Sequence, residues 1–155
     1  LWGMSQGLQP AIGANFGAKQ YNRVKKIFNV FTISSIVLAA CFWIPAEGFA
    51  KQILNLFGLS DETLFLAVPN FRIMYSIFIV YGIMIMIMTF FQAIGDGKTA
   101  GVLVMLRQVI LFIPTMIFLP YIFGAQSIWY VIPIVDGIVV LLGLQRYFTT
   151  VKKMK

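Results

Sequence analysis

Asp136 is the side chain whose position most strongly suggests chemistry. It lies about nine residues into the charge-poor run 127–147, which is about 13 Å deep at the helical rise per residue. A carboxylate at such a depth in a membrane costs about 2.5–3.5 kcal/mol, and it usually pairs with a cation or faces water. Two interpretations are open: a proton or cation site, or a structural ion pair with Arg107 or Arg72.

Arg107 is the second candidate for a functional charge. It lies about eight residues into the run 99–122, a position from which a long side chain can reach the headgroup layer. One interpretation is therefore that Arg107 extends its guanidinium to the membrane surface. The other is that it pairs with Asp136 or with a carboxylate in a loop.

Polar side chains also gather in the opening segment, where Gln6, Gln9 and Asn15 stand among apolar residues and flank a proline. The same segment carries small residues four apart, at Gly3–Gly7 and Gly13–Gly17, a spacing that lets two membrane helices approach closely. Close helix packing is one interpretation of this segment. A polar patch or hinge beside a solvent cavity is the other.

The run 66–95 gathers methionine and aromatic side chains, of which Tyr75 and Met84 are examples. Core and lipid contacts are the simpler interpretation of such a run. Methionine side chains also adapt to ligands of many shapes, and aromatic faces attract cations. The alternative is therefore that this run forms one wall of a pocket for varied lipophilic compounds.

The remaining residue types exclude several kinds of site. Histidine is absent and Cys41 is the single cysteine, which excludes a disulfide within the chain, a histidine-based metal site and a catalytic triad that uses histidine. No phosphate-binding loop or nucleophile elbow is present. We therefore expect neither an enzyme nor a bound metal or cofactor.

The elements that position these residues follow from composition. Soluble chains are about 45–50% apolar and about 25% charged, whereas this chain is 60% apolar and 11% charged. Seventeen charged side chains, 12 basic and five acidic, are too few to cover a water-soluble body this apolar. Alternating strands of about ten residues, typical of membrane barrels, are absent from the sequence. The sequence predicts an all-α, polytopic bundle of transmembrane helices.

A membrane helix needs about 20 mainly apolar residues, and the charge-free stretches meet this requirement four times. We expect one membrane domain, with a partial helix at 1–18, transmembrane helices at 27–46, 66–95, 99–122 and 127–147, and an interfacial helix at 49–57. Ser60, followed by two acids, predicts a helix start, because a hydroxyl caps free N–H groups. Thr32, Ser35 and Ala39 recur at helical spacing and predict a packing face. Since the chain opens with Leu1 inside an apolar segment, we expect a fragment of a longer protein.

The basic residues are distributed unequally between the two sides that these spans define. If the loop Lys19–Lys26 is cytoplasmic, ten Lys and Arg residues lie on or near the inner side, and only Lys51 and Arg72 lie outside. This is the pattern of the positive-inside rule, and it places the C-terminus in the cytoplasm as well. The net charge of +7 does not indicate nucleic-acid binding, because the cations fall between apolar runs.

Several sequence blocks resemble the multidrug and toxic compound extrusion (MATE) family, in the same order and with similar loop lengths. The blocks are Gln6–Lys19, which is the most specific, then Phe91–Lys98, Leu106–Gln108, Ile113–Pro114 and Pro133–Asp136. Gln92, in the second block, joins Asp136, Arg107, Gln6, Gln9, Asn15, Tyr75 and Met84 as a candidate for the substrate or ion pathway. The resemblance covers essentially the whole chain.

The resemblance implies the end of the second six-helix lobe of a twelve-helix transporter in the inner (plasma) membrane. Its partners would be the missing first lobe of the same polypeptide, membrane lipid, and small lipophilic or cationic substrates. The implied activity is secondary active efflux by alternating access, in exchange for Na⁺ or H⁺. Some members carry a coupling acid in the tenth helix, but the run 66–95 contains no Asp or Glu. The coupling acid is therefore expected either in the first lobe or at Asp136.

Two other functions are open at this stage. A flippase for lipid-linked sugars, of the same broad superfamily, should line its cavity with several cations to hold a pyrophosphate. Only Arg107 and Arg72 are candidates for that role, which favours the exporter. The third interpretation is a membrane scaffold that transports nothing and binds partner helices through its glycine-rich faces.

Overall fold

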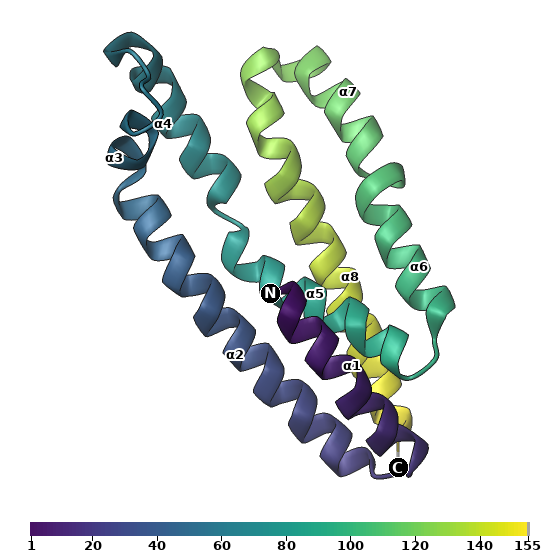
Figure 1. Ribbon diagram of the computed structural model, residues 1–155. Helices are drawn as coiled ribbons and strands as arrows, with labels where there is room; N and C mark the ends of the chain where they lie inside the picture. Colours follow the sequence, from purple (N-terminus) through teal and green to yellow (C-terminus); the bar gives the residue numbers. More distant parts are fainter. Residues whose placement is uncertain (155) are drawn as a thin grey trace.

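The computed structural model describes residues 1–154, and this part of the chain is helical, without strands (Figure 1). The first half consists of α1 Trp2–Gly17, α2 Tyr21–Gly48, α3 Ala50–Asn55, α4 Asp61–Tyr75 and α5 Phe78–Ala93. The second half consists of α6 Gly97–Met105, the π-helical turn η1 Leu106–Ile110, α7 Phe112–Phe123, the 3₁₀ helix η2 Ala125–Tyr130, and α8 Val131–Lys153.

Four helical segments are long and apolar enough to cross a membrane: Tyr21–Gly48, Asp61–Ala93, Gly97–Phe123 and Ala125–Lys153. This confirms the predicted all-α bundle with four spans. Short α3 lies between the first two spans, at one end of the bundle (Figure 1). The expected interfacial helix 49–57 is thus a six-residue helix, Ala50–Asn55.

Two of the spans, which correspond to the expected helices 66–95 and 99–122, contain local irregularities. The first is interrupted between α4 and α5, where the Ser76 hydroxyl donates to the carbonyl of Ile73 at 2.7 Å. Such a side-chain bond competes with the helical backbone pattern. The second is interrupted by η1, where the Leu111 N–H donates to the carbonyl of Leu106, five residues back, at 2.8 Å. Pro114, one turn later, favours an irregular turn here, because its ring would clash with the carbonyl of Ile110 in a regular helix.

The core lies where α1, α2, α5 and α8 come together, in the half of the bundle that contains the C-terminus (Figure 1). Three buried aromatic rings fill its centre. The Phe28 centroid lies 5.3 Å from that of Phe90 and 4.2 Å from that of Tyr147, and the last two are 4.9 Å apart. Aromatic pairs at these distances contribute beyond the area that they bury.

Small residues let α5 pack closely against its neighbours. A Cβ added to Gly82 would lie 3.1 Å from both the carbonyl oxygen and the Oγ of Ser35 on α2. Ser35 and Ala39 are almost completely buried, which confirms the predicted packing face on this helix. Gly143 on α8 plays the same part toward Ile87, where an added Cβ would lie 3.2 Å from a side-chain methyl. These contacts hold α5 at the centre of the bundle.

The outer helices leave much of their apolar surface uncovered. None of the residues of α7 is buried, and large side chains such as Ile117, Phe118 and Phe123 are exposed. The outer face of α2 is similarly apolar, with Ile33 and Phe42 exposed. Faces of this kind are suited to lipid or to further helices.

Three chain segments meet at the opposite end of the bundle from α3. They are the α1–α2 connection, the α5–α6 connection and the C-terminus (Figure 1). Lys25 Nζ donates to the carbonyl of Met154 at 3.4 Å, which ties α2 to the end of α8. In the α5–α6 connection, Asp96 caps α6 by accepting from the Thr99 Oγ1 hydroxyl at 2.7 Å and from its backbone N–H at 3.1 Å. These bonds, the hydroxyl first, hold the pKa of Asp96 below its usual value.

Candidate functional site

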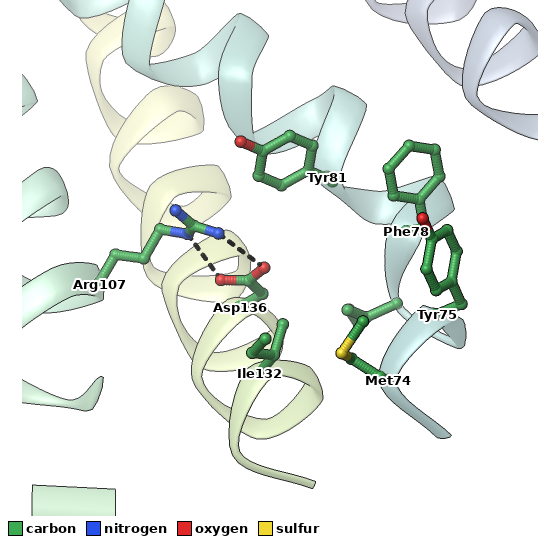
Figure 2. A pocket seen from close by; sticks show the side chains of 8 residues that line it. Met74, Tyr75, Phe78, Tyr81, Arg107, Ile132 and Asp136 are labelled. Carbon is green, nitrogen blue, oxygen red and sulfur yellow. Dashed lines mark hydrogen bonds and ion pairs between the residues drawn. The ribbon is translucent and has the colours of Figure 1, made fainter. Parts of the chain in front are cut away.

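Arg107 and Asp136 form a bidentate ion pair between the third and fourth spans. Arg107 Nε donates to Asp136 Oδ1 at 2.7 Å, and Nη2 donates to Oδ2 at 3.2 Å (Figure 2). Asp136 is only 4% exposed, whereas the side chain of Arg107 is 26% exposed. Of the interpretations set out above, the geometry therefore shows a pair between these two residues, and Arg72 forms no ion pair within residues 1–154.

Local helix structure places the two charges. Asp136 lies in the second turn of α8, and Arg107 lies in η1. A π-helical turn inserts one extra residue, and turns of this kind often occur at functional sites. Two N–H groups aimed at two carboxylate oxygens are the strongest arrangement for such a pair. The buried carboxylate thus receives both of its hydrogen bonds from one side chain.

The second span also contributes to this site, through the face of an aromatic ring. Arg107 Cζ lies 5.2 Å from the centre of the Tyr81 ring on α5. A guanidinium at this distance from a ring is attracted by the electron-rich face. Arg107 therefore joins η1, α5 and α8 at one point.

A pocket of about 210 Å³, which we call the aromatic pocket, lies on one side of the ion pair. Its wall consists of Tyr75, Phe78 and Tyr81, whose ring centres are 5.4 and 6.2 Å apart in succession. Arg107 and Asp136 also line it, together with Met74, Ile77 and Ile132 (Figure 2). The break between α4 and α5 lies in this wall. A pocket walled by aromatic rings is suited to flat apolar compounds, including cations, which the ring faces attract.

A second pocket, of about 250 Å³, borders Arg107 between α1, α5 and η1, and we call it the amide pocket. Its polar lining includes the side chains of Gln6, Gln9, Gln92 and Gln108, with Arg107 again at its edge. Apolar lining comes from Trp2, Tyr81, Met84, Ile85, Met88 and Val104. The four glutamine amides form no hydrogen bond with another side chain or the backbone within residues 1–154, so they are free to bind a ligand or water.

The structure gathers seven of the eight predicted pathway residues into these two pockets. Tyr75 and Asp136 line the aromatic pocket, Arg107 lines both, and the amide pocket takes Gln6, Gln9, Met84 and Gln92. Asn15 is the exception, because it lines neither pocket. Its amide donates to the carbonyl of Ala11 in the same helix at 2.8 Å.

Several lining residues were not among the eight candidates, and two of them border Arg107. Tyr81 lines both pockets, and Gln108 lines the amide pocket. Gln108 could have been found from the sequence, because it is a polar residue inside an apolar run and follows Arg107 directly. Tyr81 is one aromatic residue among many in its span, and only the fold distinguishes it. Within residues 1–154 no three acidic, cysteine or histidine side chains cluster as metal ligands do.

Comparisons with known proteins agree with this geometry. The model of the MatE family matches residues 1–119. The fold is similar to the structure of the MATE multidrug transporter DinF-BH, solved in complex with a ligand, with a TM-score of 0.88 and 27% sequence identity. That similarity covers 96% of this chain and 33% of the transporter, so the chain spans about a third of its length. No curated protein matches the chain significantly.

Proposed function

Because the chain belongs to the MatE family of multi-pass membrane transporters, which are not enzymes, we propose that it forms part of a secondary active exporter. Its substrates would be lipophilic, often cationic compounds, moved outward by alternating access in exchange for Na⁺ or H⁺. The observation that carries this proposal is the extent of the similarity to DinF-BH, a multidrug transporter solved with a ligand bound. Two pockets lined by adaptable thioether, aromatic and amide side chains are consistent with varied substrates.

The ion pair supplies a candidate coupling element. Asp136 is the one acid among the residues that line the two pockets, and Arg107 holds both of its oxygens. A proton or Na⁺ that bound Asp136 would weaken its attraction for Arg107. The released guanidinium would then change both pockets, since it lines both. Ion binding and substrate binding would in this way be linked through one side chain.

The lining argues against a lipid-linked sugar flippase. A pyrophosphate group needs several cations around it. Arg107 is the one cation that lines either pocket, and its charge is already paired with Asp136. The exporter therefore remains the better proposal than the flippase.

The surroundings of the helices suggest the partners. The exposed apolar faces of α2 and α7 would contact lipid and the other lobe of the same transporter. We place the protein in the inner (plasma) membrane, with the Lys19–Lys26 loop and the C-terminus on the cytoplasmic side. The common end of these two segments in the fold supports this orientation (Figure 1).

Accumulation of ethidium, a flat cationic dye, in cells that express the complete protein tests the exporter proposal. We expect lower accumulation than in control cells, and we expect an ionophore that collapses the Na⁺ and H⁺ gradients to remove the difference. Tyr81→Leu should raise accumulation, because Tyr81 lines both pockets. Tyr121→Leu is the matched control, because Tyr121 is 86% exposed on α7 and lines neither pocket. Unchanged accumulation of ethidium and of a broad panel of other dyes would overturn the proposal.

A further inference from the structure

A third pocket, of about 340 Å³, lies at the end of the bundle that holds the C-terminus. We call it the basic-end pocket. Its lining comes from the ends of α1, α2, α5 and α8 and includes Phe16, Tyr21, Arg146, Thr149, Thr150 and Lys153. It shares no lining residue with the aromatic or the amide pocket, so the proposed transport path does not account for it.

The α8 side of this pocket is a stripe of cations and hydroxyls. Arg146, Thr149, Thr150 and Lys153 follow one another at the spacing of a single helix face. Lys25 adds a third cation close by, since it binds the carbonyl of Met154, another lining residue. The Thr150 hydroxyl has no partner among residues 1–154 and is free to donate a hydrogen bond.

These cations form no ion pair with an acid in the described chain. The ion pair formed within residues 1–154 is that of the transport site, and it does not involve this end. Asp96 is near enough to Arg146 for the guanidinium to favour its ionised form. Both of its oxygens are nevertheless bound to Thr99, at 3.1 and 2.7 Å. The pocket lining itself contains two cations and no acid, so it is positively charged and combines guanidinium, ammonium and hydroxyl donors.

The depth of the pocket matches the headgroup layer of a membrane. Tyr21 is the first residue of one candidate span, and Lys153 is the last residue of another. The rings of Phe16 and Tyr21, 5.8 Å apart, form the opposite wall. Tyrosine is typical of the membrane–water interface. Basic pockets between helices at this level are suited to lipid headgroups.

We propose that the basic-end pocket binds the phosphate group of an anionic membrane lipid. Arginine and hydroxyl donors match phosphate oxygens, and the charge-assisted bonds are strong. Free inorganic phosphate would meet the same donors. A lipid is favoured because the pocket lies where spans end. At that level the phosphate of a lipid can contact Arg146 and Lys153 while the acyl chains of the same lipid lie in the hydrocarbon.

Lipid binding to the complete protein, measured by native mass spectrometry after delipidation, tests this proposal. The pocket variant is Arg146→Gln with Lys153→Gln. The control variant is Arg23→Gln with Lys152→Gln, which removes one arginine and one lysine from the same end but outside the pocket. We expect the pocket variant to bind phosphatidylglycerol about tenfold or more weakly than the wild type. The control should bind within about twofold of the wild type, since it keeps the pocket donors.

Further arms separate the sources of phosphate and exclude a folding effect. Phosphatidylcholine should bind weakly to every variant, and millimolar inorganic phosphate should not displace phosphatidylglycerol. The charge-preserving exchange of Arg146→Lys with Lys153→Arg should keep most of the binding. Equal losses in the pocket and control variants would overturn the proposal, because they indicate a general attraction to a basic surface. Displacement by inorganic phosphate would overturn the assignment to lipid.

Discussion

Removing Arg107 should destabilise the fold far more than removing Asp136. Asp136 is 4% exposed, and within residues 1–154 its two oxygens are bound by Arg107 alone. Arg107→Met therefore leaves a buried carboxylate without a partner, which costs about 3–5 kcal/mol. Asp136→Leu leaves a guanidinium that is 26% exposed, lies over Tyr81 and borders two pockets. Because water can reach that cation, we expect a cost of about 1–2 kcal/mol.

The double variant completes the comparison. Replacing a buried pair by apolar side chains is often neutral, so Arg107→Met with Asp136→Leu should lie within about 1 kcal/mol of the wild type. The measurement is the free energy of unfolding of the complete protein in mixed micelles, obtained from a denaturant titration. Two results would refute the reasoning. One is a smaller loss for Arg107→Met than for Asp136→Leu, and the other is a double variant whose loss equals the sum of the single losses.

Three further variants test the packing and the capping described above. Gly82→Ala should destabilise the fold by about 1–3 kcal/mol, because the added methyl group meets the backbone of α2. Gly101→Ala is the control and should not destabilise, because its methyl group meets nothing within 4 Å. Equal thermal stabilities of these two variants would contradict the contact at Gly82. Phe90→Ala should lower the free energy of unfolding by about 3–5 kcal/mol, since Phe90 is completely buried in the core. Asp96→Ala should cost about 1 kcal/mol as the cap of α6 is lost. The pKa of Asp96 in the folded protein is lowered from 3.8. The stability difference between the wild type and Asp96→Ala should therefore be complete above about pH 4 and disappear as the pH falls through the folded pKa. A series of thermal-stability measurements across about pH 2–7 tests this.

The number of spans and several helix ends were predictable because each depends on local sequence. Four stretches of sufficient length carry almost no charge, and a membrane helix requires little more than that. Ser60 likewise predicted the start of α4, and its hydroxyl does accept from the N–H of Thr63 at 3.4 Å. The interruption after Tyr75 was not predictable. The Ser76 hydroxyl binds the carbonyl three residues back, as the Ser35 hydroxyl does inside unbroken α2, so this side chain alone does not mark a break.

The partners of the site residues were harder to predict than the residues themselves. Asp136 was recognised because a single carboxylate in an apolar run is costly wherever it points. Arg107 and Arg72 lie in neighbouring spans at comparable depth, so the sequence left the choice of partner open, and the fold decides for Arg107. The local bond of Asn15 was hard to foresee for a related reason. An amide in a helix can bind a carbonyl one turn earlier, and this one does, which removes it from the pocket surface.

The π-helical turn and the ion pair depend on each other. Each residue of an α-helix turns the chain by about 100°, so removing the extra residue of η1 would rotate one half of the third span relative to the other by that amount. Arg107 lies within η1, and its two bonds to Asp136 at 2.7 and 3.2 Å require its present direction. Pro114 disfavours the regular alternative, because its ring opposes the carbonyl of Ile110. Since Arg107 lines both pockets, a change in this one turn would reach the ion pair and both pockets together.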